Sequence, residues 1–373
     1  MRKPQKKRIN PTFIIILALL AVGLVVIGFL AVSKLGSPIK KNVELPFNIY
    51  YNYAFTGNGF VYIEGNSFNY YSLSDNKQNY SVMLENTDVK LAGSDSVQVV
   101  YTNSAVRLPK NQASLAISGT VKSVKCFYGF VAVHIEESRV DSVEKTDKIK
   151  IFSASGEQLD EIILSGRKLL EYGFFRKGRN DQLYSIELDY QASMPITSVS
   201  TYSLTTQSKT GIITIQNQLV ECMIFTDKSV FAVGTNDIIR YEAEGNYESY
   251  RLLSYGYSLH DSSYTKSNTV FLMKNANHED DVPQTIRIYK TAQGGSPNEQ
   301  VNFMRVAESA KSVFACGDKV FVLTAGCLNR YSTLGSFDGS YKLSITVDEA
   351  QKLSDNSLLL TSGSKLYLLT LKP

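Results

Sequence analysis

The stretch Ser229–Glu242 reads SVFAVGTNDIIRYE, and Lys319–Ser332 reads KVFVLTAGCLNRYS. In both stretches a Val-Phe pair is followed, ten residues after the Val, by Arg-Tyr, and the two copies lie ninety residues apart. Each copy consists of two short apolar runs separated by a polar turn, which is the pattern of a β-hairpin. A hairpin that recurs at a fixed distance indicates a repeat architecture.

Looser copies of this hairpin occur along the chain beyond residue 42. Their leading strands begin near residues 60, 97, 130, 183, 230, 270, 320 and 358, at an average step of about 43 residues. A period of about 40–50 residues built from short strands is typical of a β-propeller. We therefore predict an all-β propeller with eight blades, seven being the alternative, over residues 42–373. Ninety residues then correspond to two blades.

Each repeat predicts how its strands lie within a blade. Both faces of a blade pack on neighbouring blades, which explains strands with consecutive apolar residues, such as VFAV and VFVL. The Val-Phe pair is expected in an inner strand and the Arg-Tyr pair in the next strand outward. Successive strand residues point to opposite faces, so the Tyr fills one interface between blades and the Arg stem lies along the other. We therefore interpret Arg240 and Arg330 as structural residues.

The two ends of the repeat region predict how the ring closes. The last unit ends in the strand Lys365–Leu371 (KLYLLTL), which has no successor in the sequence. A strand near Asn42–Tyr51 (NVELPFNIYY) supplies the missing one. Closure of this kind removes exposed sheet edges.

The charge of the chain is divided between its two parts. The net charge is +4, but residues 1–41 carry eight bases and no acid, so the remainder has 31 bases against 35 acids. A nucleic-acid-binding domain carries a basic surface, and this folded part has no excess of base. The composition therefore argues against a nucleic-acid partner.

An apolar segment lies directly before the repeats. Phe13–Val32 (FIIILALLAVGLVVIGFLAV) contains no charged residue, and twenty helical residues span about 30 Å, the thickness of a bilayer's hydrocarbon core. Five bases precede the segment and three follow it, which places the N-terminus in the cytoplasm. We predict a basic cytoplasmic tail (1–12), a transmembrane signal anchor (13–33), a linker (34–41) and an extracytoplasmic propeller (42–373). Cleavage after a signal peptide, near Ala31–Ser33, is the alternative.

No sequence motif for catalysis, a metal ion or a cofactor is present. His134 follows an apolar run and is interpreted as a packed residue, and the loop His278–Asp281 as a solvated turn. The neighbouring acids Glu136 and Glu137 face apart on a strand, so they do not converge on a substrate. The sequence predicts no catalytic, cofactor-binding or metal-binding residue. It leaves open the disulfide state of the four cysteines, which are Cys126, Cys222, Cys316 and Cys327.

The basic tail, the single apolar span and a degenerate propeller without Trp together resemble an uncharacterised family of single-pass, membrane-anchored β-propeller proteins of Gram-positive bacteria. The blade rhythm is similar to that of quinoprotein and WD-repeat propellers, although their Trp signatures are absent here. The resemblance implies a domain held at the outer face of the cytoplasmic membrane.

A propeller presents loops on two faces of a rigid ring, which favours binding or scaffolding at the cell envelope. The expected partner is a protein or an envelope polymer, and an envelope hydrolase acting on glycan or peptide is the alternative. Tyr is suited to contact surfaces because it offers rigid amphipathic area. We predict that Tyr255, Tyr257 and Tyr264, interpreted as loop residues in SYGYSLHDSSYTK, contact the partner.

Overall fold

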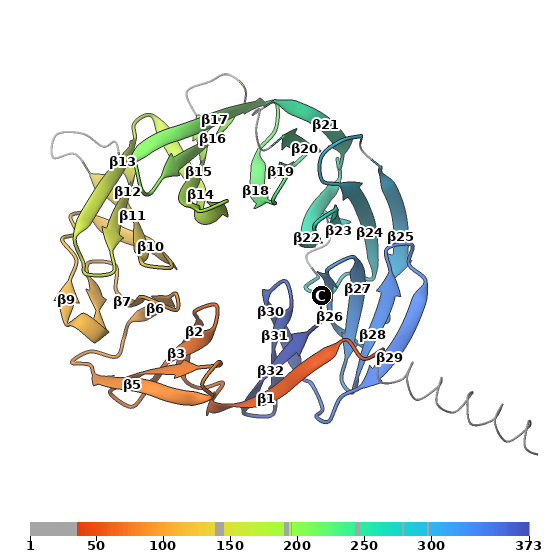
Figure 1. The fold of residues 1–373 in the computed structure, drawn as a ribbon, viewed down its shortest axis with the longest axis horizontal. Coiled ribbons are helices and arrows are strands. Elements are labelled where there is room, and N and C mark those ends of the chain that lie inside the picture. The colour runs from red at the N-terminus through yellow and green to blue at the C-terminus, as the bar shows by residue number, and fades with distance from the viewer. Residues whose placement is uncertain are drawn as a thin grey trace, which may run out of the picture.

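The computed structural model describes residues 36–138, 145–189, 194, 196–242, 247–277, 280–296 and 298–372. Within these residues the chain forms eight four-stranded antiparallel sheets, arranged as blades around a central axis (Figure 1). The prediction of eight blades is confirmed, and the seven-bladed alternative is wrong. The predicted tail and anchor lie outside the described residues, and no helix among the described ones is long and apolar enough to cross a membrane.

We number the blades along the chain. Blade 1 contains β2 (Asn52–Phe55), β3 (Gly59–Glu64), β4 (Ser67–Ser72) and β5 (Lys77–Met83). Blade 2 contains β6 (Lys90–Gly93), β7 (Gln98–Tyr101), β8 (Val106–Leu108) and β9 (Ala113–Ser114), with the short 3-10 helix η1 (Pro109–Asn111) between the last two. Blade 3 contains β10 (Thr120–Phe127), β11 (Phe130–Ser138), β12 (Lys145–Ser153) and β13 (Gln158–Leu164). Blade 4 contains β14 (Arg167–Lys177), β15 (Asn180–Asp189), β16 (Ile196–Ser203) and β17 (Ser208–Gln216).

The second half of the ring continues in the same order. Blade 5 contains β18 (Val220–Phe225), β19 (Ser229–Gly234), β20 (Asp237–Glu242) and β21 (Glu248–Leu253). Blade 6 contains β22 (Tyr257–Tyr264), β23 (Asn268–Asn275), β24 (Thr285–Ala292) and β25 (Gln300–Arg305). Blade 7 contains β26 (Ala310–Cys316), β27 (Lys319–Thr324), β28 (Cys327–Ser332) and β29 (Phe337–Lys342). Blade 8 contains β30 (Glu349–Ser354), β31 (Ser357–Ser362), β32 (Lys365–Leu371) and β1 (Ile39–Asn48).

The repeated hairpin lies where the sequence predicts it. Phe231 of β19 is opposite Arg240 of β20, and Phe321 of β27 is opposite Arg330 of β28. The two hairpins belong to blades 5 and 7, so the spacing of ninety residues corresponds to two blades.

The strands that the sequence analysis placed first in each repeat are the second strands of their blades. The innermost strand of each blade was not predicted. β19 has four consecutive buried residues, 231–234, and β27 also has four, 320–323. Runs of this kind are easily recognised in a sequence. An innermost strand such as β22 is only half-buried over most of its length because one side of it lines the central channel. Its mixed composition therefore resembles that of a turn.

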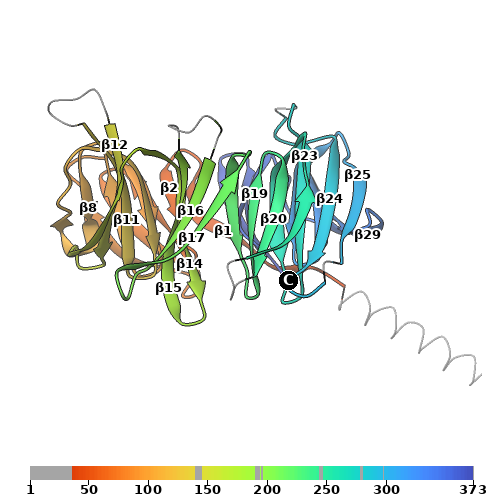
Figure 2. The same ribbon diagram turned by 90° about the horizontal axis from the view of Figure 1, so that it is seen from above.

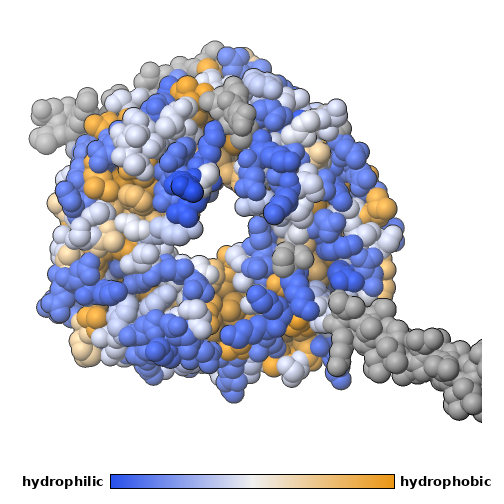
Figure 3. All heavy atoms as spheres, viewed as in Figure 1, coloured by the Kyte–Doolittle hydropathy of each residue, from blue (hydrophilic) through white to orange (hydrophobic). Residues whose placement is uncertain are grey.

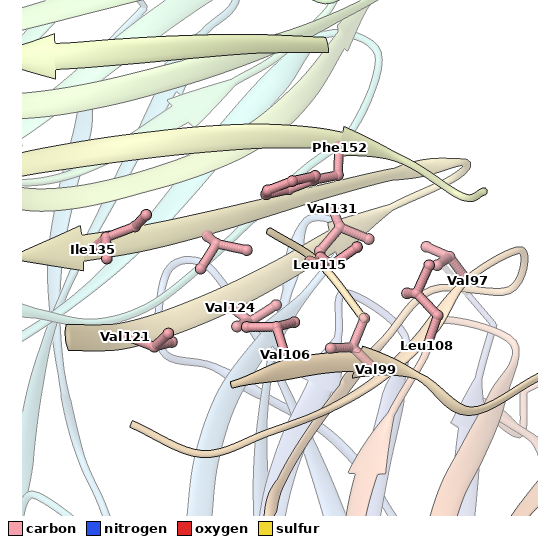
Figure 4. Close-up of a cluster of buried hydrophobic side chains, with 11 residues drawn as sticks. Val97, Val99, Val106, Leu108, Leu115, Val121, Val124, Val131, Ile135 and Phe152 are labelled. Atoms are coloured by element: carbon pink, nitrogen blue, oxygen red, sulfur yellow. The ribbon is translucent and has the colours of Figure 1, made fainter. Parts of the chain in front are cut away.

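The hydrophobic core is divided into clusters between adjacent blades. Figure 4 shows the cluster between blades 2 and 3, in which Val99 and Leu108 of blade 2 meet Val124, Val131 and Phe152 of blade 3. Burial of such side chains contributes about 1.5–3 kcal/mol each. Because every blade contributes to two clusters, the ring must be complete for all of them to form.

The ring is closed by pairing of the two ends of the described chain. β1 lies beside β32 in antiparallel register, with Ile39 opposite Leu371 and Asn42 opposite Leu369. The prediction of this closure is confirmed, but the strand begins at Ile39, so it overlaps the predicted linker and starts before the predicted boundary at residue 42. The pairing of Lys41 with Thr370 and of Ile39 with Leu371 extends the strand backwards, although Lys40 and Lys41 are both exposed and the register shifts between Ile39 and Lys41. Exposed lysines are common on an edge strand such as β1.

Because all pairings are antiparallel, the turns are sorted onto two faces of the ring. One face carries the start of β1 at Ile39, the end of β32 at Leu371, and the turns between first and second and between third and fourth strands. We refer to it as the terminal face. The other, distal face carries the turns between second and third strands and the links between blades. Figure 2 shows the ring edge-on, with the C-terminal end and the β14–β15 hairpin at the same face.

Candidate functional site

Hydrophilic side chains predominate around the opening of the channel (Figure 3), and a network of ion pairs lies at the distal end of blade 3. Glu136 lies 2.8 Å from the Nζ of Lys145 and 3.1 Å from that of Lys122. Glu137, its neighbour, lies 2.5 Å from the Nζ of Lys148. The two glutamates thus have different lysine partners, as predicted for adjacent residues of a strand. Because lysines lie beside both carboxylates, we interpret Glu136 and Glu137 as members of structural ion pairs.

A buried aspartate joins blades 3 and 4 near this network. The Oδ1 of Asp147 lies 3.0 Å from the Nε2 of His134, and its Oδ2 accepts a 2.9 Å hydrogen bond from the backbone N–H of Leu169. Lys168 Nζ lies 3.2 Å from the same Oδ2. Burial raises the pKa of Asp147, but the hydrogen bonds with His134, Leu169 and Lys168 outweigh it and lower the pKa to about 2. The packed, structural interpretation of His134 agrees with this contact.

We expect Asp147→Asn to destabilise the protein by about 1–3 kcal/mol at pH 7, because a charged acceptor of three hydrogen bonds is replaced by a neutral amide. The ordinary pKa of an aspartate is about 3.9. A group whose pKa is depressed on folding stabilises the protein above its unfolded pKa and loses this contribution as the pH falls through its folded pKa. The stability difference between the two proteins should therefore shrink between about pH 4 and pH 2, as measured by urea unfolding. A difference that stays constant down to pH 2 contradicts the assignment.

The arginines of the repeated hairpin have structural roles, as predicted. Arg240 is buried, and it donates hydrogen bonds of 2.9 Å to the carbonyl oxygen of Ala292 and 2.7 Å to that of Gly295, both in blade 6. It therefore joins blade 5 to its neighbour. Arg330 is only partly buried and donates a 3.4 Å hydrogen bond to the carbonyl oxygen of Gly36.

Among the residues that the structure describes, no group of three or more His, Cys, Asp or Glu side chains is arranged to hold a metal ion. Of the acidic loop considered above, His278 and Glu279 lie outside the described residues, whereas Asp280 and Asp281 are exposed. The four cysteines are free thiols, and burial raises the pKa of Cys126 to about 12. A thiol of this kind is protonated at neutral pH and is a poor nucleophile.

Two of the pockets in the described part of the chain bear on a candidate site, and both have the size of a small ligand or a side chain. The first has a volume of about 330 Å³ and opens at the terminal face between blades 4 and 5, where Phe175 stacks on Phe225. The second, of about 270 Å³, lies at the distal end of blade 6. It is lined by Tyr257, Asn275, Asp280, Pro283, Gln284, Thr285 and Phe303.

Exposed apolar side chains from two blades lie at the distal face near this pocket. Leu253 is the last residue of β21, Tyr255 lies on the link between blades 5 and 6, and Phe303 lies on the outermost strand of blade 6; all three are more than half exposed. The hydroxyl of Tyr289 donates a 3.1 Å hydrogen bond to the carbonyl oxygen of Leu253, which holds this link against blade 6. We refer to Leu253, Tyr255, Tyr257 and Phe303 as the distal cluster.

The three tyrosines predicted to contact a partner are separated by the fold. Tyr255 lies in a link between blades, as expected, but Tyr257 and Tyr264 are the first and last residues of strand β22, so their interpretation as loop residues is wrong. Eight strand residues extend about 23 Å at about 3.3 Å per step. Tyr257 therefore lies with Tyr255 at the distal face, whereas Tyr264 lies at the terminal face. The sequence did not indicate this separation because the half-buried strand between them is polar.

Comparisons with known proteins bear on the fold. No family model and no curated protein matches the chain. Among solved structures, it is similar to the WD40 domain of SCAP from fission yeast, with 10% identity and a TM-score of 0.54 over 88% of this chain and 98% of that one. It is similar to Saccharomyces cerevisiae Sqt1, with 10% identity and a TM-score of 0.54 over 90% and 99%. The Dos1 propeller gives 8% identity and a TM-score of 0.54 over 90% and 94%. At these identities the likeness concerns the fold alone, which is the β-propeller.

Proposed function

We propose that this protein is a single-pass membrane protein whose extracytoplasmic propeller binds a protein or polymer of the cell envelope through its distal face. Anchoring is inferred from the apolar segment Phe13–Val32 within the predicted anchor 13–33, which leaves five residues (34–38) before β1 begins at Ile39. Five residues reach at most about 17–18 Å when fully extended. The propeller is therefore held close to the bilayer.

The place at which β1 begins supports one orientation of the propeller relative to the membrane. Ile39 lies at the terminal face, so a short connection from the membrane directs this face towards the bilayer. The distal face is then directed away from the membrane, where large envelope components have access to it. In this arrangement the distal pocket is more accessible to a partner than the pocket between blades 4 and 5.

The observation that carries the proposal is the distal cluster, of which Tyr257 and Phe303 line the distal pocket. Exposed apolar groups gathered beside a concave surface are typical of interaction sites, and aromatic residues are enriched in such sites. Leu253, Tyr257 and Phe303 belong to paired strands, so little backbone entropy is lost when they contact a partner. Binding or scaffolding agrees with these features and requires no catalytic group.

We expect the double substitution of Leu253 and Tyr255 by Ser to reduce recovery of the crosslinked partner from intact cells at least about fivefold, which corresponds to about 1 kcal/mol of binding free energy. The matched control replaces Leu334 and Phe337 by Ser. These two residues are similarly exposed, at 60% and 59% against 68% and 74%, but lie at the terminal face. Recovery is measured by quantitative mass spectrometry after crosslinking, at equal expression of both variants.

Equal loss in both variants, or loss in the control alone, overturns the assignment to the distal face.

The orientation is checked by adding protease to intact protoplasts: residues 36–373 should be digested, and protection of the propeller contradicts an extracytoplasmic location. If the mature protein begins after Ser33, the apolar segment is a cleaved signal peptide, and the protein is secreted and not anchored. If recovery is unchanged and the purified protein hydrolyses an envelope glycan or peptide, the hydrolase alternative holds instead.

A further inference from the structure

An arginine beside the distal pocket is held against three aromatic rings. The guanidinium carbon of Arg287, in β24, lies 4.6 Å from the ring centroid of Tyr289, 4.9 Å from that of Tyr257 and 5.5 Å from that of Phe303. Contacts of this kind fix the orientation of the planar guanidinium group and reduce the entropy lost when it forms a hydrogen bond. Arg287 is thus pre-oriented within the distal cluster.

The hydrogen-bonding capacity of Arg287 is not used within the described part of the chain. Its Nε is buried and has no hydrogen-bond partner there, and none of the described carboxylates forms an ion pair with it. By contrast, the buried Arg240 has a hydroxyl, two carbonyl groups and a carboxylate around it. A guanidinium group carries five N–H donors, and leaving them unpaired in a partly desolvated position is unfavourable. Arg287 therefore offers unused donors at the edge of a pocket.

The register of the sheet places a second arginine near the first. Arg287 pairs with Phe303, and Thr285 pairs with Arg305, across β24 and β25 without a register shift. Residues two apart on a strand share a face, so Arg305 emerges on the same face of the sheet as Phe303 and Arg287. Arg305 is exposed. The two bases flank an aromatic ring, which favours a ligand with negative charge next to apolar surface.

The other polar groups of the pocket indicate what carries that charge. Asn275 and Gln284 present amides that both donate and accept, and the carboxylate of Asp280 accepts hydrogen bonds. Backbone N–H and C=O groups of a peptide satisfy such a mixture, whereas a purely anionic polymer is repelled by Asp280. We propose that the distal pocket binds an acidic peptide segment of a protein partner, an inference that rests on the proposed function. A Glu or Asp carboxylate of the peptide then contacts Arg287, and an adjacent apolar side chain packs against Phe303 and Tyr257.

The test uses the full chain in nanodiscs and two labelled decapeptides of Gly and Ser, one with a single Glu next to a single Phe and one with a single Gln next to a single Phe. Binding is measured by fluorescence anisotropy. We expect the Glu peptide to bind at least about tenfold more tightly, since hydrogen bonds between charged groups are roughly twice as strong as neutral ones. In Arg287→Gln this ratio should fall below about twofold.

The matched control is Arg179→Gln. Arg179 is exposed in the β14–β15 turn at the terminal face, so its substitution removes the same charge and should leave the ratio unchanged. Arg287→Lys retains the charge but not the planar donor pair, and should lower the ratio at least about threefold even if Arg287→Gln does not fold. Equal binding of both peptides, or the same loss in Arg179→Gln, overturns the proposal. If the crosslinked partner is recovered equally well from Arg287→Gln cells but is lost with the Leu253 and Tyr255 double substitution, distal-face binding stands and the acidic-peptide proposal fails.

Discussion

A chain shortened to begin at Tyr50, and so lacking β1, will fail to form a stable ring, whereas one that begins at Gly36 will melt as a single cooperative unit. β1 supplies the fourth strand of blade 8, and its Leu45 and Phe47 are 5% and 3% exposed. Phe47 also stacks on Tyr62 of blade 1, with ring centroids 4.7 Å apart. Loss of two buried side chains at about 1.5–3 kcal/mol each, together with the strand pairing, approaches the 5–15 kcal/mol that stabilises a typical domain.

This result is measured by thermal unfolding followed by circular dichroism and by binding of a dye to exposed apolar surface. A synthetic peptide with the sequence of residues 36–49, added to the shortened chain, should restore part of the lost stability because it can occupy the open edge of β32. Deleting Lys365–Leu371 should be equally damaging, since it removes the strand between β1 and β31. Unchanged melting of the chain that begins at Tyr50 means that closure by β1 does not stabilise the ring.

The second large effect is expected at Arg240. Arg240→Ala should destabilise the propeller by about 3–5 kcal/mol, because it leaves the carbonyl groups of Ala292 and Gly295 without their donors at the boundary of blades 5 and 6. The matched substitution is Arg330→Ala, which changes the same position of the repeat two blades later. Arg330 is partly exposed, with a 3.4 Å hydrogen bond to Gly36 and an ion pair of 3.9 Å with Asp338, so its removal should cost about 1 kcal/mol or less.

Urea unfolding of the two variants provides the comparison, with the dependence of stability on urea concentration as a check that both unfold as one unit. Equal losses in the two variants indicate that the contacts between blades 5 and 6 do not distinguish these arginines. A large loss at Arg330 alone would falsify the assignment of the buried role to Arg240.

The sequence predicted the second and third strands of the blades because these are buried on both faces. Residues such as Phe231 and Val233 pack towards one neighbouring blade and Ala232 towards the other, so apolar residues follow one another without interruption. The innermost strands were missed because one of their sides faces the channel, where burial is incomplete. The same strand, β22, explains why Tyr257 and Tyr264 were interpreted as residues of one loop although the fold separates them.

The distal pocket was not predictable from the sequence. Arg287 is one of many bases, and nothing near it in the chain shows that Tyr257 and Phe303, which precede and follow it at a distance, contact its guanidinium group. Only the pairing of β22, β23, β24 and β25 brings these side chains onto one face of a sheet. Tyr255 and Tyr257 were identified as candidates by residue type, and their role in binding remains a prediction.

The amino-acid sequence by itself determined the number of blades, the strands that close the ring and the apolar segment that precedes them, because periodicity and continuous apolar runs are local properties of the chain. Tertiary structure alone decided which of two identical motifs is buried. Arg240 and Arg330 occupy the same position of the repeat, yet one reaches two carbonyl groups of the next blade and the other lies beside the start of β1. The physical reason is that burial and hydrogen bonding of a side chain depend on the neighbouring blade, and the repeat does not specify that neighbour.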